Sequence, residues 1–227
     1  MHEQRTMLSY GETEALLRRY DIALPASHLA QTPAEAAAAA ELLGFPVALK
    51  AISGDISHKS DRGLVRLGLD RPAAVAEAAQ ALLEKVDWGT EATLEGLLVQ
   101  RLLPGGVEMI AGIHHDAQFG PLVLLGSGGV LVELLDDAVL RLPPLTRSEA
   151  LSMIEATRSY PLLQGFRGFP PADIDALAAL LVNLSRLALA AGSTQLSLDL
   201  NPVLVLPRGQ GVGVVDFRAE VSREKSI

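Results

Sequence analysis

The chain has 227 residues and a mass of 24.0 kDa, and its 19 basic and 27 acidic side chains give a net charge of −8. An acidic protein with a pI near 5.1 has no general attraction for phosphodiester backbones or anionic lipid, which argues against nucleic-acid and membrane-surface roles. A hydrophobic content of 49% and a charged content of 20% are typical of a folded globular protein. The absence of cysteine excludes disulfides, thiolate metal sites and cysteine nucleophiles. Because no segment has the roughly 20 uninterrupted apolar residues of a membrane helix, and the N-terminus is too polar for a signal peptide, we expect a cytoplasmic protein.

The first half of the chain alternates predicted helices and strands. The clearest boundary is a helix start, where Thr32 as N-cap, Pro33 at the first helical position and Glu35 three residues after the cap form a capping box. This helix runs to about Gly44. The other elements predicted in this half are a helix at residues 12–20, an extended segment at 22–30, an apolar strand at 46–52, a polar loop at 53–62, a hairpin partner strand at 63–69 and a helix at 72–85.

The second half opens with predicted strands and closes with helices and further strands. A glycine-rich turn at residues 126–129 leads into a short strand that ends near residue 135. Together with the first half, this order predicts a mixed α+β fold in two lobes. The elements predicted here are strands at 94–103, 106–116 and 119–126, helices at 146–158 and 171–191, and two final strands around Pro207–Gly209.

Lys50 is the one charged residue of the apolar strand at 46–52. A buried ammonium needs a partner, so Lys50 is either a lysine that snorkels at the strand end or a phosphate ligand. The loop that follows places an imidazole, two hydroxyls and an ammonium within residues 57–61. This grouping suits an oxyanion or phosphoryl site, with a solvated polar turn as the alternative.

The turn at residues 126–129, Gly-Ser-Gly-Gly, has two interpretations. It is either a tight hairpin or a backbone nest whose N–H groups face phosphate oxygens. It matches neither the phosphate-loop pattern nor the GxGxxG fingerprint, so it is weak evidence by itself.

Oxygen-bearing side chains gather near the end of the chain. Asp199 and Asn201 alternate on one face of a predicted strand, and Asp216 ends the next apolar strand. If those strands pair through the turn at Pro207, their oxygens meet at one point and suit Mg²⁺ bound chiefly through substrate phosphates and water. Glu108 is a fourth candidate, although each acid taken alone is more simply a surface charge. His114 and His115 are adjacent on a strand and point to opposite faces, so no two-histidine metal site is expected there.

Four ordered blocks together resemble the ATP-grasp domain of ADP-forming acyl-CoA synthetases, which is related to the succinyl-CoA synthetase beta subunit. In that family the domain occurs as a separate beta subunit, as one region of a fused synthetase, or inside large proteins that also carry an acetyltransferase domain. The resemblance extends from about Leu8 to Ala219. The blocks are PVALKAISGDISHKSDRGLVRLGL, GVEMIAGIHHDAQFGPLVLLGSGGVLVELL, GFRGFPPADIDALAALLVNLSRLA and LDLNPVLVL.

The resemblance implies a single ATP-grasp unit over residues 1–227 that binds ATP or ADP with Mg²⁺ between two lobes. The smaller lobe would comprise residues 22–93, and the larger nucleotide- and metal-binding lobe residues 1–21 plus 94–227. The implied roles are Lys50 on the α- and β-phosphates, His58, Lys59 and Ser60 over the phosphates, Val99 and Gln100 at adenine largely through backbone groups, Glu108 on the ribose or nucleotide side, the Gly128 and Gly129 amides on phosphate, and Asn201 and Asp216 on Mg²⁺.

The implied chemistry converts acyl-CoA, ADP and phosphate into free acid, CoA and ATP through an acyl phosphate and a phosphohistidine on a CoA-binding partner. His58 resembles the second histidine, which relays the phosphoryl group to ADP, and a neutral imidazole is a competent nucleophile near pH 7. No CoA-binding Rossmann-type region fits into this sequence. We therefore expect the chain to work with a CoA-binding alpha subunit or fused domain, in a hetero-oligomer.

Two departures from the family keep an alternative function open. Where the family commonly has a glycine pair, this chain has Arg62-Gly63-Leu64, which would restrict the loop. Ser197 replaces an acidic residue that would support the metal site. The alternative is a regulatory nucleotide-binding module of a protein acetyltransferase-type assembly without turnover of its own. A degenerate domain kept for assembly is a third possibility, which the intact Lys50 and Asp216 disfavour.

Overall fold

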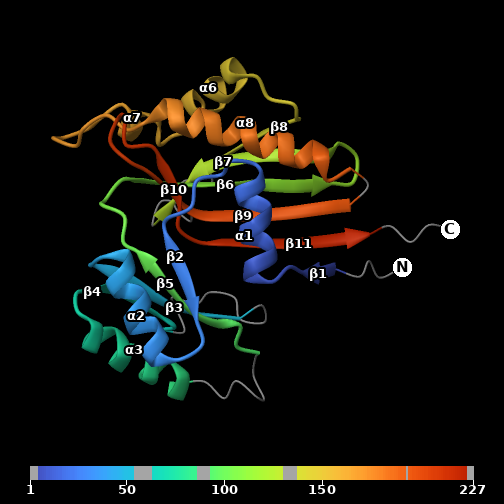
Figure 1. Cartoon of the computed structure of the whole chain (residues 1–227). Coiled ribbons are helices and arrows are strands. Elements are labelled where there is room, and N and C mark those ends of the chain that lie inside the picture. The colour runs from blue at the N-terminus through green and yellow to red at the C-terminus, as the bar shows by residue number, and fades with distance from the viewer. Residues whose placement is uncertain (1–4, 54–62, 86–92, 130–136, 193, 224–227) are drawn as a thin grey trace. The chain divides into compact units, whose positions relative to one another are not determined.

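The protein is described by a computed structural model that covers residues 5–53, 63–85, 93–129, 137–192 and 194–223 (Figure 1). The chain forms two compact units, each with its own sheet and its own apolar core. Unit 1 comprises residues 1–8, 12–24 and 104–227, and unit 2 comprises residues 9–11 and 25–103.

Unit 1 is built on an antiparallel sheet with one long central strand. Its strands are β1 (Arg5–Met7), β6 (Val107–Asp116), β7 (Gly120–Ser127), β8 (Ala138–Arg141), β9 (Thr194–Val205), β10 (Val212–Val214) and β11 (Phe217–Arg223). The sheet order is β1-β11-β9-β6-β7-β8, and β10 pairs with the end of β9. Because β9 spans 12 residues, it pairs with β6 along one edge and with β11 and then β10 along the other.

Helices cover one face of this sheet. They are α1 (Tyr10–Arg19), α6 (Arg147–Glu155), α7 (Tyr160–Leu163) and α8 (Ile174–Ala190). The apolar helix α8 lies along β6, β7 and β9, with α6 packed beside it (Figure 1). Alternate strand residues, such as Met109, Ala111 and Ile113 of β6, enter the core that α8 closes. The residues between them therefore lie on the opposite face of the sheet.

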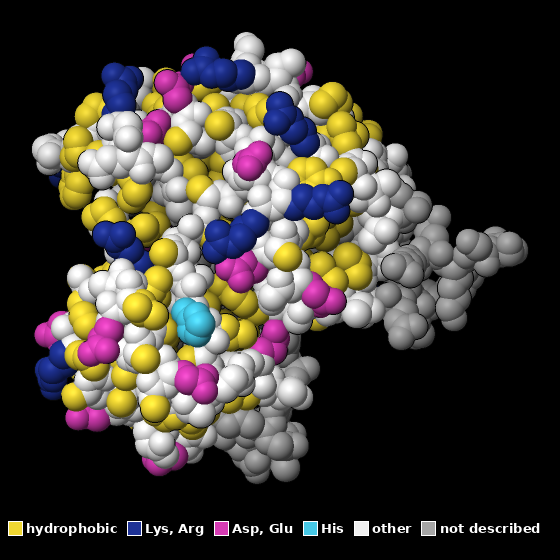
Figure 2. Space-filling view, viewed as in Figure 1, with side chains coloured by type: hydrophobic (Ala, Val, Ile, Leu, Met, Phe, Trp, Pro, Cys, Tyr) yellow, Lys and Arg dark blue, Asp and Glu magenta, His cyan; other side chains and the backbone are white. Residues whose placement is uncertain are grey.

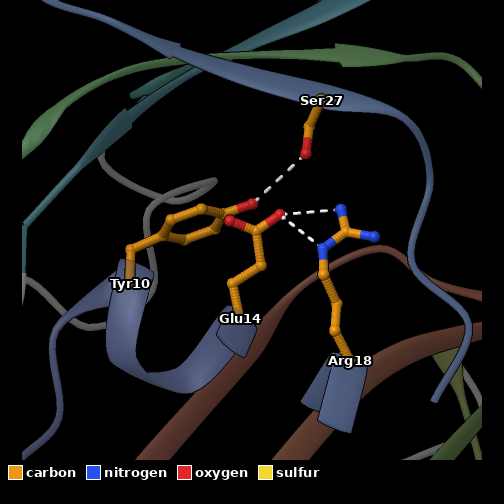
Figure 3. Close-up of polar contacts among 4 residues, drawn as sticks. All are labelled: Tyr10, Glu14, Arg18 and Ser27. Carbon is orange, nitrogen blue, oxygen red and sulfur yellow. Dashed lines mark hydrogen bonds and ion pairs between the residues drawn. The ribbon is translucent and has the colours of Figure 1, made fainter. Parts of the chain in front are cut away.

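Helix α1 makes polar contacts at its start and one turn further along, of which Figure 3 shows those among Tyr10, Ser27, Glu14 and Arg18. Tyr10, which groups with unit 2, donates its backbone N–H to Glu95 Oε2 at 2.8 Å, and its hydroxyl lies 3.5 Å from that of Ser27. A carboxylate at a helix N-terminus is favourable because the first N–H groups there have no helical acceptor. Within unit 1, Glu14 accepts from Arg18 Nη2 at 2.8 Å, one helical turn further on.

Unit 2 is a four-stranded antiparallel sheet packed against two helices. Its elements are β2 (Ser27–Ala30), α2 (Pro33–Leu43), β3 (Val47–Ile52), β4 (Val65–Leu69), α3 (Pro72–Lys85) and β5 (Gly96–Arg101), and the sheet order is β2-β5-β3-β4. The predicted cap of α2 is confirmed, since Thr32 Oγ1 accepts from Glu35 N at 3.2 Å. The reciprocal bond of the box runs from Gln31 N to Glu35 at 2.8 Å instead of from the cap residue.

The boundaries between the units differ from those expected at residues 22 and 93. Residues 94–103 were expected in the larger lobe, but β5 lies between β2 and β3 and buries Leu97 and Val99 in the core of unit 2. Ile22 belongs to the core of unit 1. Unit 2 therefore runs from Pro25 to Leu103.

The strands near the end of the chain agree only in part with the sequence predictions. The predicted pairing through the turn at Pro207 is confirmed, because β10 folds back on β9 with Val214 opposite Val203. β11 is a separate strand that pairs with the other half of β9, and it was not predicted as such. The short strand expected after the glycine-rich turn falls mostly on residues outside the described part.

The helices and the surface charges agree with what the composition predicted. Among the described residues, no helix combines the length and the apolar character needed to cross a bilayer. On the face shown in Figure 2, coloured Lys and Arg side chains are interspersed with Asp, Glu and apolar ones. Mixed charge of this kind gives a polyanion no extended basic surface on that face.

Candidate functional site

Asn201 and Asp216 lie side by side in unit 1. Asn201 N donates to Asp216 O at 3.0 Å, and Val215 N donates to Pro202 O at 2.9 Å. These bonds fill the gap between the β9–β10 and β9–β11 ladders, so the two residues face each other at the point where both ladders meet. The two residues that the sequence placed on two strands are thereby brought together through their backbones, and Asp216 Oδ1 accepts from Phe217 N at 3.0 Å.

The polar candidates of unit 1 share the sheet face that α8 does not cover. On β9, Leu196, Leu198 and Leu200 are buried in the core, whereas Asp199 and Asn201 are exposed. Glu108, on β6, is also exposed and precedes the core residue Met109. Period-two alternation thus separates the apolar residues from the ones that can bind a ligand.

A polar depression of about 330 Å³ lies on this face beside Asp199. Arg218 is directly opposite Asp199 in the ladder and also pairs with Glu220, at 3.1 Å. Partial burial raises the pKa of the Asp199 carboxyl above its ordinary value, and Glu220 adds to this, while Arg218 and His114 oppose it. The lining also includes Arg5, Gly112, His114 and Ser197.

Glu108 is in close contact with the glycine-rich turn. Gly128 N donates to Glu108 O at 2.9 Å, and a Cβ on Gly128 would lie 2.7 Å from the Glu108 carbonyl carbon. Gly129 has a φ of +61°, and a Cβ there would lie 2.5 Å from Glu108 Oε2. A side chain at Gly128 would meet the Glu108 backbone and one at Gly129 the Glu108 carboxylate, so the turn packs tightly against Glu108.

In unit 2, Lys50 lies in a buried strand and is bound by a glutamine. Lys50 is 4% exposed, and its Nζ donates to Gln100 Oε1 at 2.9 Å. The amide oxygen offsets part of the cost of burying the ammonium and fixes where it points. Gln100 therefore acts on Lys50 through its side chain.

Val99 and Gln100, which were expected to meet adenine largely through backbone groups, lie in the middle of the unit 2 sheet. Both residues lie in β5, which is hydrogen-bonded to β2 on one side and β3 on the other, so their backbone groups are used within the sheet. The Val99 side chain is fully buried in the core of unit 2. Val99 thus packs in the core and Gln100 accepts from Lys50, while the adenine contact stays a prediction.

His58, Lys59 and Ser60 lie outside the described residues. The structure does describe the end of that loop, where Gly63 has a φ of +63° and Leu64 is fully buried. Leu64 O accepts from Ala51 N at 3.0 Å. Leu64 is thus a core residue of unit 2 that directly precedes β4, and the expectation that Arg62-Gly63-Leu64 restricts the loop stays a prediction.

One group of polar residues was not singled out from the sequence. Ser127 Oγ donates to Asp137 Oδ2 at 2.6 Å and lies 2.5 Å from Ser159 Oγ. The partners are 10 and 32 residues from Ser127 along the chain, and no local pattern links them. Only the tight spacing of glycines at residues 126–129 indicated that this turn is closely packed.

The donor set of unit 1 suits a hard cation that is held mainly by a ligand. Asn201 and Asp216 offer an amide and a carboxylate oxygen, which Mg²⁺ prefers. Within the described part of the chain, no three His, Cys, Asp or Glu side chains are arranged to hold a metal by themselves. A cation bound here would take its other ligands from water and from phosphate.

The fold has two antiparallel sheets, each packed against helices. Its candidate site combines Asn201 and Asp216, where β9, β10 and β11 meet, with a glycine-rich turn that packs against Glu108. These features are typical of one class of nucleotide-binding proteins. Residues 1–221 match the ATP-grasp domain, and the chain belongs to that family. It is 37% identical to the acetate–CoA ligase (ADP-forming) II beta subunit of Pyrococcus furiosus, over 94% of this chain and 91% of that subunit.

Two further comparisons agree. The acetate–CoA ligase (ADP-forming) I of Archaeoglobus fulgidus is 41% identical over 92% of this chain, and the chain spans 30% of its length. The acetyl-coenzyme A synthetase 1 of Ca. Korarchaeum cryptofilum superposes with a TM-score of 0.80 at 35% identity, over 96% of this chain and 93% of that chain. That structure contains coenzyme A and Mg-AMPPCP, with a phosphohistidine segment pointing towards the nucleotide binding site.

Proposed function

We propose that this chain is the nucleotide-binding module of an ADP-forming acyl-CoA ligase, active together with a CoA-binding alpha subunit or fused domain. The observation that carries the proposal is the backbone hydrogen bond from Asn201 to Asp216, which places these two residues opposite each other in unit 1. Family membership and the ligase relatives support it. The relatives do not favour a regulatory module without turnover.

The side chains have distinct roles in binding ATP or ADP. Lys50 binds phosphate oxygens, because a held ammonium is a strong partner for them. Glu108 binds the ribose side, and the Gly128 and Gly129 N–H groups face phosphate. Asn201 and Asp216 hold Mg²⁺, which neutralises phosphate charge when bound. Positioning and charge neutralisation account for most of the catalysis in phosphoryl transfer.

His58 carries the phosphoryl group. The P–N bond to the partner's phosphohistidine breaks as a P–N bond to the His58 imidazole forms. A second transfer breaks that bond and forms the P–O bond between the phosphoryl group and the β-phosphate of ADP, which yields ATP. The acyl group is selected on the partner, with acetyl as the leading candidate. Nucleotide substrates and a cysteine-free composition support a cytoplasmic location.

Reconstitution tests this function directly. The chain is mixed with its CoA-binding partner, acyl-CoA, ADP, Mg²⁺ and phosphate, and ATP is measured together with acid-labile phosphate on His58. His58→Ala should abolish ATP formation and the label. The matched control is His28→Ala, an exposed histidine on β2, which should keep normal activity. Normal ATP formation by His58→Ala would show that His58 is not the carrier.

A further inference from the structure

A series of buried hydrogen bonds from Ser159 through Ser127 to Asp137, called the polar chain below, lies next to the glycine-rich turn in unit 1. Ser127 and Ser159 are 3% and 1% exposed. Ser127 donates its only hydroxyl hydrogen to Asp137 Oδ2, so the 2.5 Å contact between the two hydroxyls must be donated by Ser159. Arg158 N also donates to Asp137 Oδ2, at 2.8 Å. The Asp137 carboxylate is therefore the final acceptor of this series of hydrogen bonds.

This polar chain and Glu108 enclose the turn from two sides. A Cβ on Gly126 would lie 2.6 Å from Asp137 O, just as a Cβ on Gly129 would meet the Glu108 carboxylate. Gly128 N is bonded to Glu108 O on the same strand pair. Because Ser127 is followed directly by Gly128, and Gly128 and Gly129 pack closely against Glu108, we expect loss of the polar chain to shift the turn and Glu108 together.

We propose that Asp137, Ser127 and Ser159 are positioning residues for the nucleotide site, which act on Glu108 through the Gly128–Gly129 turn. This inference rests on the proposed function, in which Glu108 binds the nucleotide. None of the three side chains needs to touch the ligand. Their effect should therefore depend on the presence of the Glu108 carboxylate.

A double-mutant cycle measures that dependence, with the affinity of the full chain for ATP–Mg²⁺ determined by calorimetry. Asp137→Ala should weaken binding by about tenfold, the scale expected when a binding group is misplaced by part of an ångström. In a Glu108→Ala background the same change should cost less than about twofold, because the group it positions is gone. Equal losses in both backgrounds, or no loss in either, would overturn the positioning role.

Rescue and control variants separate positioning from general destabilisation. Asp137→Asn keeps an oxygen that can accept from Ser127 and Arg158, so it should retain affinity to within about threefold. Ser185 is a fully buried serine of α8 whose Oγ accepts from Leu145 N. Ser185→Ala should lower the melting temperature without changing ATP affinity. If Asp137→Ala does not fold, Ser159→Ala replaces it, since that variant leaves the Ser127–Asp137 bond in place.

The result distinguishes failure of this inference from failure of the proposed function. If Glu108→Ala binds ATP–Mg²⁺ as tightly as the natural sequence, the assignment of Glu108 is wrong and the positioning role falls with it. If Glu108→Ala weakens binding while Asp137→Ala does not, only the positioning role is wrong.

Discussion

Lys50 and Gln100 form a buried donor–acceptor pair across neighbouring strands, with Nζ donating to Oε1 at 2.9 Å. Gln100 lies on β5 two residues beyond the position directly opposite Lys50 on β3, which is the diagonal neighbour relationship of antiparallel strands. Only 3% of Gln100 is exposed, so its amide is part of the interior of unit 2. The proposed phosphate ligand is therefore oriented by a strand that lies 50 residues later in the chain.

Gln100→Leu should destabilise the protein by about 1–3 kcal/mol, because it removes a buried acceptor of the ammonium and fills the space with an apolar group. The free energy of unfolding, from urea denaturation, measures the effect. Gln80→Leu is the control, since Gln80 is exposed on α3 and bonds only across one helical turn to Glu84. That change should stay within about 0.5 kcal/mol. Equal effects of the two variants would contradict the importance of the buried pair.

Lys50→Met combined with Asp216→Asn should reduce ATP–Mg²⁺ affinity by more than about 100-fold, since each removes a charge-assisted contact to the phosphates or their cation. Calorimetric titration of the folded double variant measures the loss. Asp175→Asn, on the exposed first turn of α8, should bind as the natural sequence does. An unchanged affinity of the double variant would show that the nucleotide binds elsewhere.

Asp199→Asn should stabilise the protein at neutral pH. The pKa of Asp199 is raised in the folded state, so between the unfolded and folded values the folded protein binds more protons and its stability falls as pH rises. Above both values the ionised carboxylate costs stability, and asparagine removes that cost. The gain should be below about 1 kcal/mol because the group is partly solvated. Urea denaturation from pH 7 towards pH 4 should show the gain shrinking, and a loss at pH 7 would contradict the direction.

Asp173→Ala should cost about 2–4 kcal/mol, the sum expected for a helix cap and two further hydrogen bonds to a carboxylate. Asp173 Oδ1 accepts from Ala176 N at 3.2 Å, and Oδ2 accepts from Gly209 N and Gly211 N at 2.9 Å each. Asp173 thus joins α8 to the turn between β9 and β10. Asp175→Ala, two residues later, breaks only an exposed ion pair with Arg147 and should cost less than about 1 kcal/mol. Comparable unfolding free energies for the two variants would refute the joining role.

Local patterns in the sequence predicted the parts of this protein that depend on neighbouring residues. The cap at Thr32 and the meeting of Asn201 with Asp216 follow from short-range spacing and one turn, and both are present. The position of β5 could not be predicted in this way, because apolar strands fit either sheet equally well by pattern. Strand pairing depends on tertiary packing, which also placed β11 beside β9.

Contacts within the candidate site were also beyond prediction, because they depend on tertiary packing. Glu108 and the glycines at 128 and 129 could be singled out by residue type, but their contact depends on the β6–β7 register. Leu64 was placed in the strand predicted at 63–69, but the pattern alone did not show that its side chain is fully buried in the core. The hydrogen bonds from Ser159 through Ser127 to Asp137 join three separate segments. No pattern within any one segment predicts that these side chains meet.

The pairing of β1 with β11 places Arg5 directly opposite Ser222, at one edge of the unit 1 sheet. The start of β1 and the end of β11 therefore lie at the same end of two neighbouring strands. This gives a topological reason why one module can serve both as most of a separate subunit, as in the Pyrococcus furiosus relative, and as 30% of a longer chain, as in the Archaeoglobus fulgidus one. A connection made at that end would leave the sheet and its helices uninterrupted.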